Sequence, residues 1–204
     1  EGAERMKYFN KSVFYFIVNV AILLIVLTKT LFAWSSGPPA YRTGAPGDEG
    51  ACNADGCHNS YSLDSGNAEF SITGPTSFTP GERIKLEVSF DSSSGKSHGF
   101  EMTAIDANAN RIGKFKAIKK TTQVIPPNDY RGLEKADKGT YIEHTAKGKK
   151  KKSWKVKWIP PGSASGTVTF YAAGNEANDD GTNAGDYIYT TTLEIAAESS
   201  ASGQ

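Results

Sequence analysis

Hydrophobic and polar residues alternate with a period of two in several short stretches of this chain. Between residues 84 and 90, isoleucine, leucine, valine and phenylalanine alternate with lysine, glutamate and serine. A period of two places successive side chains on opposite faces, which is typical of a half-buried β-strand. The same alternation predicts further strands in residues 100–104, 154–158, 168–172 and 187–195.

Turn-forming residues separate these stretches. Clear examples are Thr79-Pro80-Gly81, residues 106–110 and Pro160-Pro161-Gly162. Glycine is also abundant, with 21 residues, which favours turns between short strands over long helices. The sequence therefore predicts a mainly β fold, an immunoglobulin-like antiparallel β-sandwich over residues 68–197. The small polar residues 198–204 are expected to form a flexible tail.

An apolar run lies near the N-terminus. Residues 13–28 are interrupted only by Asn19 and are preceded by Lys7 and Lys11. Together with residues 31–34, the run approaches the roughly 20 residues that span a bilayer. A cleaved signal peptide is the alternative, but no clear small-x-small cleavage site follows the run. We expect residues 1–34 to be a transmembrane anchor with a cytoplasmic N-terminus, which makes the chain a single-pass membrane protein with a periplasmic or extracytoplasmic domain.

Residues 35–67 show no periodicity and are expected to be a linker. Residues 35–50 contain three prolines and four glycines, which break helices. Cys52, Cys57 and His58 follow directly, with four residues between the cysteines. A covalent c-type haem usually needs C-x-x-C-H, and Gly56 gives this longer loop the freedom to close. The segment therefore predicts one haem c, bound through both cysteines with His58 as an iron ligand.

Two other uses of the same residues stay open. Cys52 and Cys57 could form a disulfide outside the cytoplasm, which would leave His58 as an ordinary surface residue. A zinc site is less favoured, because zinc needs four ligands and only three lie together here.

The second axial iron ligand has few candidates in this sequence. His144 is favoured because it lies in a strand-like stretch, in phase with the apolar Ile142. Met102 and His98 are the alternatives. Met102 has the pattern of a core residue and His98 lies in a polar turn.

Several separated blocks of the chain resemble one known family. The stretch SGPPAYRTGAPGDEGACNADGCH is similar to the start of the choice-of-anchor V domain, a bacterial β-sandwich related to the reelin-type domain. The resemblance covers nearly all of residues 37–195 and implies the sandwich fold and a cysteine pair that ends in Cys-His. The family typically has C-x-x-C-H, so the longer spacing is a departure. The further blocks are residues 78–81, 99–104, 141–145, 170–175 and 185–190.

These observations favour an electron-transfer function. We expect a membrane-anchored monohaem c-type cytochrome that transfers electrons to or from a respiratory or photosynthetic membrane complex, with the lipid bilayer as a second partner. The net charge of +1 does not suggest a nucleic-acid partner. With only three histidines and no catalytic arrangement, an enzyme is not expected. The alternative is a haem-free extracytoplasmic adhesion or scaffold module with a Cys52–Cys57 disulfide.

Two polar stretches have a second interpretation each. Residues 147–157 hold seven lysines, which suits either a solvated hairpin tip or a docking patch for acidic partners or lipid phosphates. Residues 175–186 are rich in oxygen ligands and could hold calcium, although they lack the spacing of an EF-hand loop. Turn chemistry is the favoured interpretation of the second stretch.

Overall fold

The computed structural model describes residues 13–19, 36–128 and 130–198. Residues 13–19 form a short helix, which belongs to a separate compact unit. Within the described ranges no helix is long and apolar enough to cross a membrane. The predicted single-pass location is therefore overturned in this part of the chain. Residues 1–12 and 20–34 of the predicted anchor lie outside the described residues.

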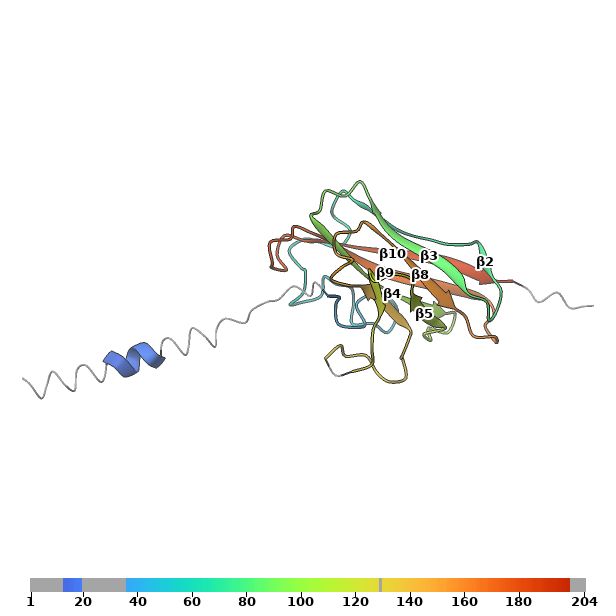
Figure 1. Ribbon diagram of the computed structural model, residues 1–204, viewed down its shortest axis with the longest axis horizontal. Helices are drawn as coiled ribbons and strands as arrows, with labels where there is room; N and C mark the ends of the chain where they lie inside the picture. Colours follow the sequence, from blue (N-terminus) through green and yellow to red (C-terminus); the bar gives the residue numbers. More distant parts are fainter. Residues whose placement is uncertain (1–12, 20–35, 129, 199–204) are drawn as a thin grey trace, which may run out of the picture. The chain divides into compact units, whose positions relative to one another are not determined.

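The domain that follows is built of short strands joined by turns (Figure 1). Most of these strands have an alternating sequence, because one face of the strand is buried in the core. The strands are β1 (Glu69–Thr73), β2 (Ser77–Phe78), β3 (Ile84–Asp91), β4 (Ser97–Asp106), β5 (Lys114–Ala117), β6 (Thr122–Val124), β7 (Tyr141–His144), β8 (Ser153–Ile159), β9 (Thr167–Ala177) and β10 (Tyr187–Ala197).

Two sheets organise these strands. One has the order β1-β3-β8-β5, and the other has the order β2-β10-β9-β4-β7-β6. Neighbouring strands are antiparallel except for β2, which pairs in parallel with the end of β10. The prediction of a mainly β, sandwich-like fold is confirmed.

The core lies between the two sheets. Aromatic side chains from both sheets meet there: the ring centroid of Trp158 lies 5.4 Å from that of Phe78 and 5.0 Å from that of Phe170. Trp154 and Trp158 are almost fully buried, and Trp154 Nε1 donates to the carbonyl of Gly148 at 3.2 Å. Burial of these apolar side chains between the sheets is the main stabilising contribution to such a domain.

Strand β4 departs from the alternation that its sequence predicts. Phe100, Met102 and Ala104 point into the core as expected, but Glu101 and Thr103 are fully buried as well. The face of the six-stranded sheet that lies away from the core is therefore covered over β4 and β7 rather than solvated there. This covered face holds the candidate functional site.

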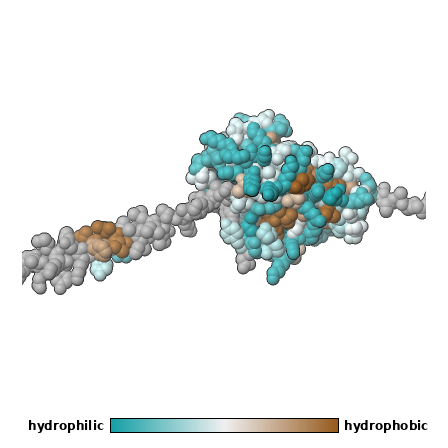
Figure 2. Space-filling view, in the orientation of Figure 1, coloured by the Kyte–Doolittle hydropathy of each residue, from teal (hydrophilic) through white to brown (hydrophobic). Residues whose placement is uncertain are grey.

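The face of the domain that Figure 2 shows is mostly hydrophilic, with some apolar areas between the hydrophilic residues. Strands β5 and β6, which the alternation did not predict, have only four and three residues. In β5 only Phe115 is buried, so a strand this short shows too few apolar positions for a period to be recognised.

Candidate functional site: the cysteine segment and the covered sheet face

Part of the predicted linker packs against the six-stranded sheet. Ala51 and Cys52 form a small buried cluster with Ala173 of β9 and Ile188 of β10. Gln123 Nε2 donates to the carbonyl of Ser36 at 2.7 Å, which holds the start of the linker to β6. Although it contains no named strand, this stretch is a structural cover in contact with the sandwich.

Residues 51–60, here called the cysteine segment, fold into consecutive tight turns. The amide of Ala54 donates to Ala51 O at 3.1 Å, and that of Cys57 donates to Ala54 O at 2.9 Å. The amide of His58 then reaches back to Cys52 O at 3.1 Å. Gly56 has a φ of 80°, a conformation that glycine adopts without strain. The loop between the two cysteines is therefore closed by backbone hydrogen bonds.

The two cysteines have different environments. Both are free thiols in this structure, with Cys52 buried and Cys57 partly exposed. Cys52 Sγ lies 3.6 Å from the carbonyl oxygen of Arg42. Burial raises the pKa of the Cys52 thiol far above its usual range, and the nearby Glu101 carboxyl adds to this shift. Cys52 is therefore held as a neutral thiol.

This difference predicts unequal reactivity in the reduced, folded protein. Because the thiolate is the nucleophile, Cys57 should react with iodoacetamide at least about tenfold faster than Cys52. Peptide mass spectrometry after a timed pulse measures both rates. In denaturant the two rates should converge, and equal rates in the folded protein would contradict the buried placement of Cys52.

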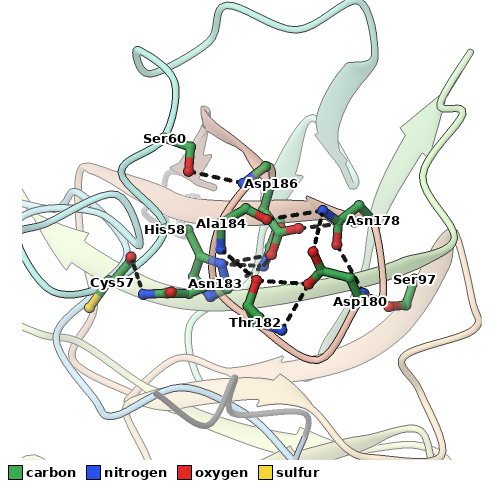
Figure 3. A network of polar contacts seen from close by, with 12 residues as sticks. Cys57, His58, Ser60, Ser97, Asn178, Asp180, Thr182, Asn183, Ala184 and Asp186 are labelled. Carbon is green, nitrogen blue, oxygen red and sulfur yellow. Dashed lines mark hydrogen bonds and ion pairs between the residues drawn. The ribbon is translucent and has the colours of Figure 1, made fainter. Parts of the chain in front are cut away.

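His58 is bound to the β9–β10 loop. Its Nδ1 lies 2.8 Å from Oδ2 of Asp186 in this loop, and the side-chain nitrogen Nδ2 of Asn175 in β9 lies 3.2 Å from the same ring nitrogen. Two further bonds join the segments: Asn183 Nδ2 donates to Cys57 O at 2.6 Å, and the Gly185 amide donates to Ser60 Oγ at 2.9 Å (Figure 3). His58 thus fastens the cysteine segment to the sandwich.

The acidic residues of the β9–β10 loop are occupied by the loop itself. Asp186 Oδ1 accepts the Asn178 amide at 2.9 Å, and Asp180 Oδ1 accepts both the amide and the hydroxyl of Thr182 at 2.8 Å (Figure 3). These are the bonds that Asx turns make without a cation. The oxygen ligands considered for calcium are therefore used in fixing the loop that receives His58.

The other candidate iron ligands lie in three separate environments. Met102 is fully buried in the core between the sheets. His98 is buried at the start of β4, where its Nε2 lies 2.6 Å from Ser93 Oγ, and burial lowers its pKa. Ser93 in turn donates to Glu176 at 2.6 Å.

His144 does not project into the core beside Ile142, as the alternation predicted. Its ring lies across the backbone of β4, with Nδ1 3.2 Å from the amide nitrogen of Phe100. A Cβ at Gly99 would lie 2.5 Å from His144 Cε1, so only glycine leaves room for the ring there. Burial lowers the pKa of His144 to about 4, and it is therefore a neutral imidazole at physiological pH.

Two buried glutamates lie on the covered face, and the sequence did not single them out. Glu101 is completely buried, and among the described residues its carboxylate oxygens have no hydrogen-bond partner of good geometry, although the backbone amide of Arg42 acts on the carboxylate. Burial raises the pKa of Glu101 well above its usual range, and Asp48 and Glu143 raise it further, which favours the protonated carboxyl. Its position in an alternating strand predicts a solvated side chain, and nothing in that local pattern indicates the cover.

Glu143 has a cationic partner. Its carboxylate accepts hydrogen bonds from Arg131 and, at 2.7 Å, from Gln123 Nε2. Burial raises the pKa of Glu143 to about 7, opposed by the Arg131 guanidinium. Arg131 also donates to the carbonyl of Pro38, so one side chain links the covering stretch to β7.

A second polar cluster fastens the same cover. The side chain of Asp48 is fully buried, and its carboxylate accepts hydrogen bonds from the Thr43 amide at 3.0 Å, the Thr43 hydroxyl at 2.6 Å and the Tyr141 hydroxyl. Arg111 lies 2.9 Å from the same carboxylate and stacks 4.7 Å from the ring centre of Tyr41. The cover is therefore attached to the sheet by ionic as well as apolar contacts.

Comparison with protein families agrees with this arrangement. Residues 50–179, well over half of the chain, match the model of the Reeler domain. No curated protein matches the chain. The predicted relation to the reelin-type domain is confirmed.

The predicted cytochrome function is wrong. In the ranges that the structure describes, no group of three or more His, Cys, Asp or Glu side chains could hold a metal ion, and the matching family is an extracellular module. The same findings overturn the descriptions of the chain as an iron-containing, electron-transport protein. Among the described residues, the side chains that contact the His58 ring are Asp186 and Asn175, and none of the candidate second ligands is among them: Met102, His98 and His144 are each buried elsewhere in the domain.

Proposed function

This chain belongs to the Reeler family, and from that membership we propose that it serves as a haem-free extracytoplasmic adhesion or scaffold module. Reeler domains are extracellular modules, which fits a sandwich whose polar groups are used for structure rather than catalysis. We propose no enzymatic activity and no nucleic-acid partner. The finer resemblance, to the choice-of-anchor V domain with an immunoglobulin-like sandwich, is part of the same proposal and rests on the blocks in residues 37–195.

The observation that carries the proposal is the use of the cysteine segment as a fastened cover. Cys52 packs into the apolar cluster with Ala173 and Ile188, and His58 is held by Asp186. Both side chains thus contribute to attaching the cover to the sheet. A binding module needs such a rigid support more than a reactive centre.

We further propose that Cys52 and Cys57 are joined by a disulfide in the oxidising extracellular environment. Backbone hydrogen bonds within residues 51–58 already bring the two ends of the loop together. Disulfides persist outside the cytoplasm, where small loops gain order from them. The bond would form by loss of both thiol protons and two electrons to a compartment oxidant such as a thiol–disulfide oxidoreductase.

Mass spectrometry of protein purified from an oxidising compartment tests this function. The expected intact mass is that of the polypeptide less a pair of hydrogen atoms, and reduction should restore them. The Cys57→Ser variant is the matched control and should show no change on reduction. A haem mass that persists through acid–acetone extraction would overturn the proposed function, whereas two free thiols without haem would overturn only the disulfide.

A further inference from the structure

Three lysines lie side by side on the outer face of the four-stranded sheet. Lys85 of β3 is the cross-strand partner of Lys157 in β8, and Lys157 is the partner of Lys116 in β5. Neighbouring strands lie about 4.8 Å apart, so the row presents one ammonium group per strand. We call these three residues the lysine strip. Lys85 and Lys116 are exposed and Lys157 is partly exposed.

The strip has no compensating carboxylate. No ion pair joins any of its three ammonium groups to another residue in the described parts of the chain. Like charges directly opposite each other on a sheet are destabilising. A row of three such residues therefore lowers stability, and an anion that lies on the row would reduce this cost.

The structure divides the lysine-rich stretch 147–157 into paired and unpaired members. Lys149 and Lys150 lie 3.3 Å and 2.5 Å from the carboxylate of Asp179, and Lys155 lies 3.7 Å from that of Glu87. Lys157 is not among these pairs and joins Lys85 and Lys116, which are distant in sequence. The binding surface is therefore a product of strand order, not of the lysine-rich stretch itself.

Acidic residues lie toward the other end of this sheet face. At the other end, Glu69 of β1 is the cross-strand partner of Asp91 in β3, and both are exposed. Between the two ends, Glu87 and Lys155 are cross-strand partners and balance each other. A planar anionic membrane would press its headgroups against the Glu69–Asp91 end as well. A linear chain of anions can follow the strip alone.

We propose that the lysine strip binds a linear polyanion, a chain of sulfate or phosphate groups that lies across β3, β8 and β5. The inference names a partner for the proposed extracellular module. It rests on the proposed function in one respect, that the polyanion would be met outside the cell. Salt screens contacts between exposed charges, so binding should weaken as ionic strength rises. Two probes separate the two types of anion. Dextran sulfate carries sulfate groups and inorganic polyphosphate carries phosphate groups, so a comparison of their affinities shows which group the strip prefers.

Titration calorimetry of the full chain at low salt tests the inference. The triple variant Lys85→Gln/Lys116→Gln/Lys157→Gln should lose about tenfold or more in affinity for the preferred polyanion, since it removes the local field. The matched control, Lys147→Gln/Lys149→Gln/Lys150→Gln, removes the same amount of charge from the part of the lysine-rich stretch that lies outside the strip. It should bind within about threefold of the unmodified protein. Neutral dextran should not bind either variant or the unmodified protein.

A second measurement guards against a folding defect. Because it relieves repulsion within the row, the strip variant should melt at a temperature equal to or above that of the unmodified protein. Equal losses of affinity in the two triple variants would overturn the inference, as would the absence of polyanion binding. Strip-dependent binding to phosphatidylglycerol vesicles with no binding to the soluble chains would also overturn it. Each of these outcomes concerns polyanion binding alone. The proposed function would still hold in each case if the protein carries no haem.

Discussion

Replacement of Arg131 by methionine is expected to lower the free energy of unfolding by about 3–5 kcal/mol at pH 8, because it leaves a buried carboxylate without its cation. Arg131 is buried and bonds to the fully buried Glu143 and to the carbonyl of Pro38. Urea unfolding followed by tryptophan fluorescence measures the change. Loss of the bond to Pro38 should also loosen the cover, which hydrogen exchange at residues 36–50 would report.

The effect of Arg131→Met should depend on pH. The folded-state pKa of Glu143 is raised from 4.5 to about 7 by burial, so its ionisation reduces stability as pH rises from 4.5 through 7. Without Arg131, ionisation of Glu143 in the folded protein reduces stability by a larger amount. The variant should therefore be closer to the unmodified protein at pH 5, where Glu143 is protonated in both. A destabilisation of the same size at pH 5 and pH 8 would contradict the role of the ion pair.

Two further variants complete the test. Lys155→Met removes the exposed partner of Glu87 and should change stability by no more than about 1 kcal/mol. In the double variant Arg131→Met/Glu143→Gln the uncompensated charge is absent, so part of the lost stability should return.

His144→Asn is expected to make the protein more resistant to acid. Burial lowers the pKa of His144 from 6.5 to about 4, so the unfolded chain binds this proton more readily than the folded one. The contribution of His144 is thus fully present above pH 6.5 and is lost as pH falls toward 4. The loss amounts to about 3 kcal/mol at pH 4. Asparagine can take over the contact with the Phe100 amide and does not titrate in this range.

The measurement compares the two proteins across pH 4–7. The difference between their unfolding free energies isolates His144, because Glu101 and Glu143 titrate in the opposite direction and are present in both proteins. As the pH falls from 7 to 4, we expect the unfolding free energy of the variant to rise by about 3 kcal/mol relative to that of the unmodified protein. Parallel stability curves would show that His144 is not a buried neutral imidazole.

The sequence by itself determined the strands that form the core. In Ile84–Asp91 and Ser153–Ile159, every second residue is apolar, and those residues are the ones that the structure buries between the sheets. A period of two needs no knowledge of the partner strand, because it follows from the geometry of a single strand. The sandwich-like fold and the relation to the reelin-type domain were predictable for this reason.

The use of the cysteine segment was not predictable in the same way. Cys52, Cys57 and His58 at this spacing favoured a haem over a disulfide or a zinc site in local terms, and that preference was wrong for the function. Only the contact of His58 with Asp186, 128 residues away in sequence, indicates that the segment fastens a cover. Such long-range pairings are formed by tertiary packing and leave no local pattern.

The tertiary structure alone also decided which polar residues are buried and which charges stand together. Glu101 is on the outward side of an alternating strand, and it is buried because residues 36–67, which have no period of their own, lie over that face. Lys85, Lys116 and Lys157 become a row because β3, β8 and β5 are neighbours in the sheet. Periodicity states which side of a strand is apolar, but strand order and coverage depend on contacts between distant segments, and these determine the electrostatics of both faces.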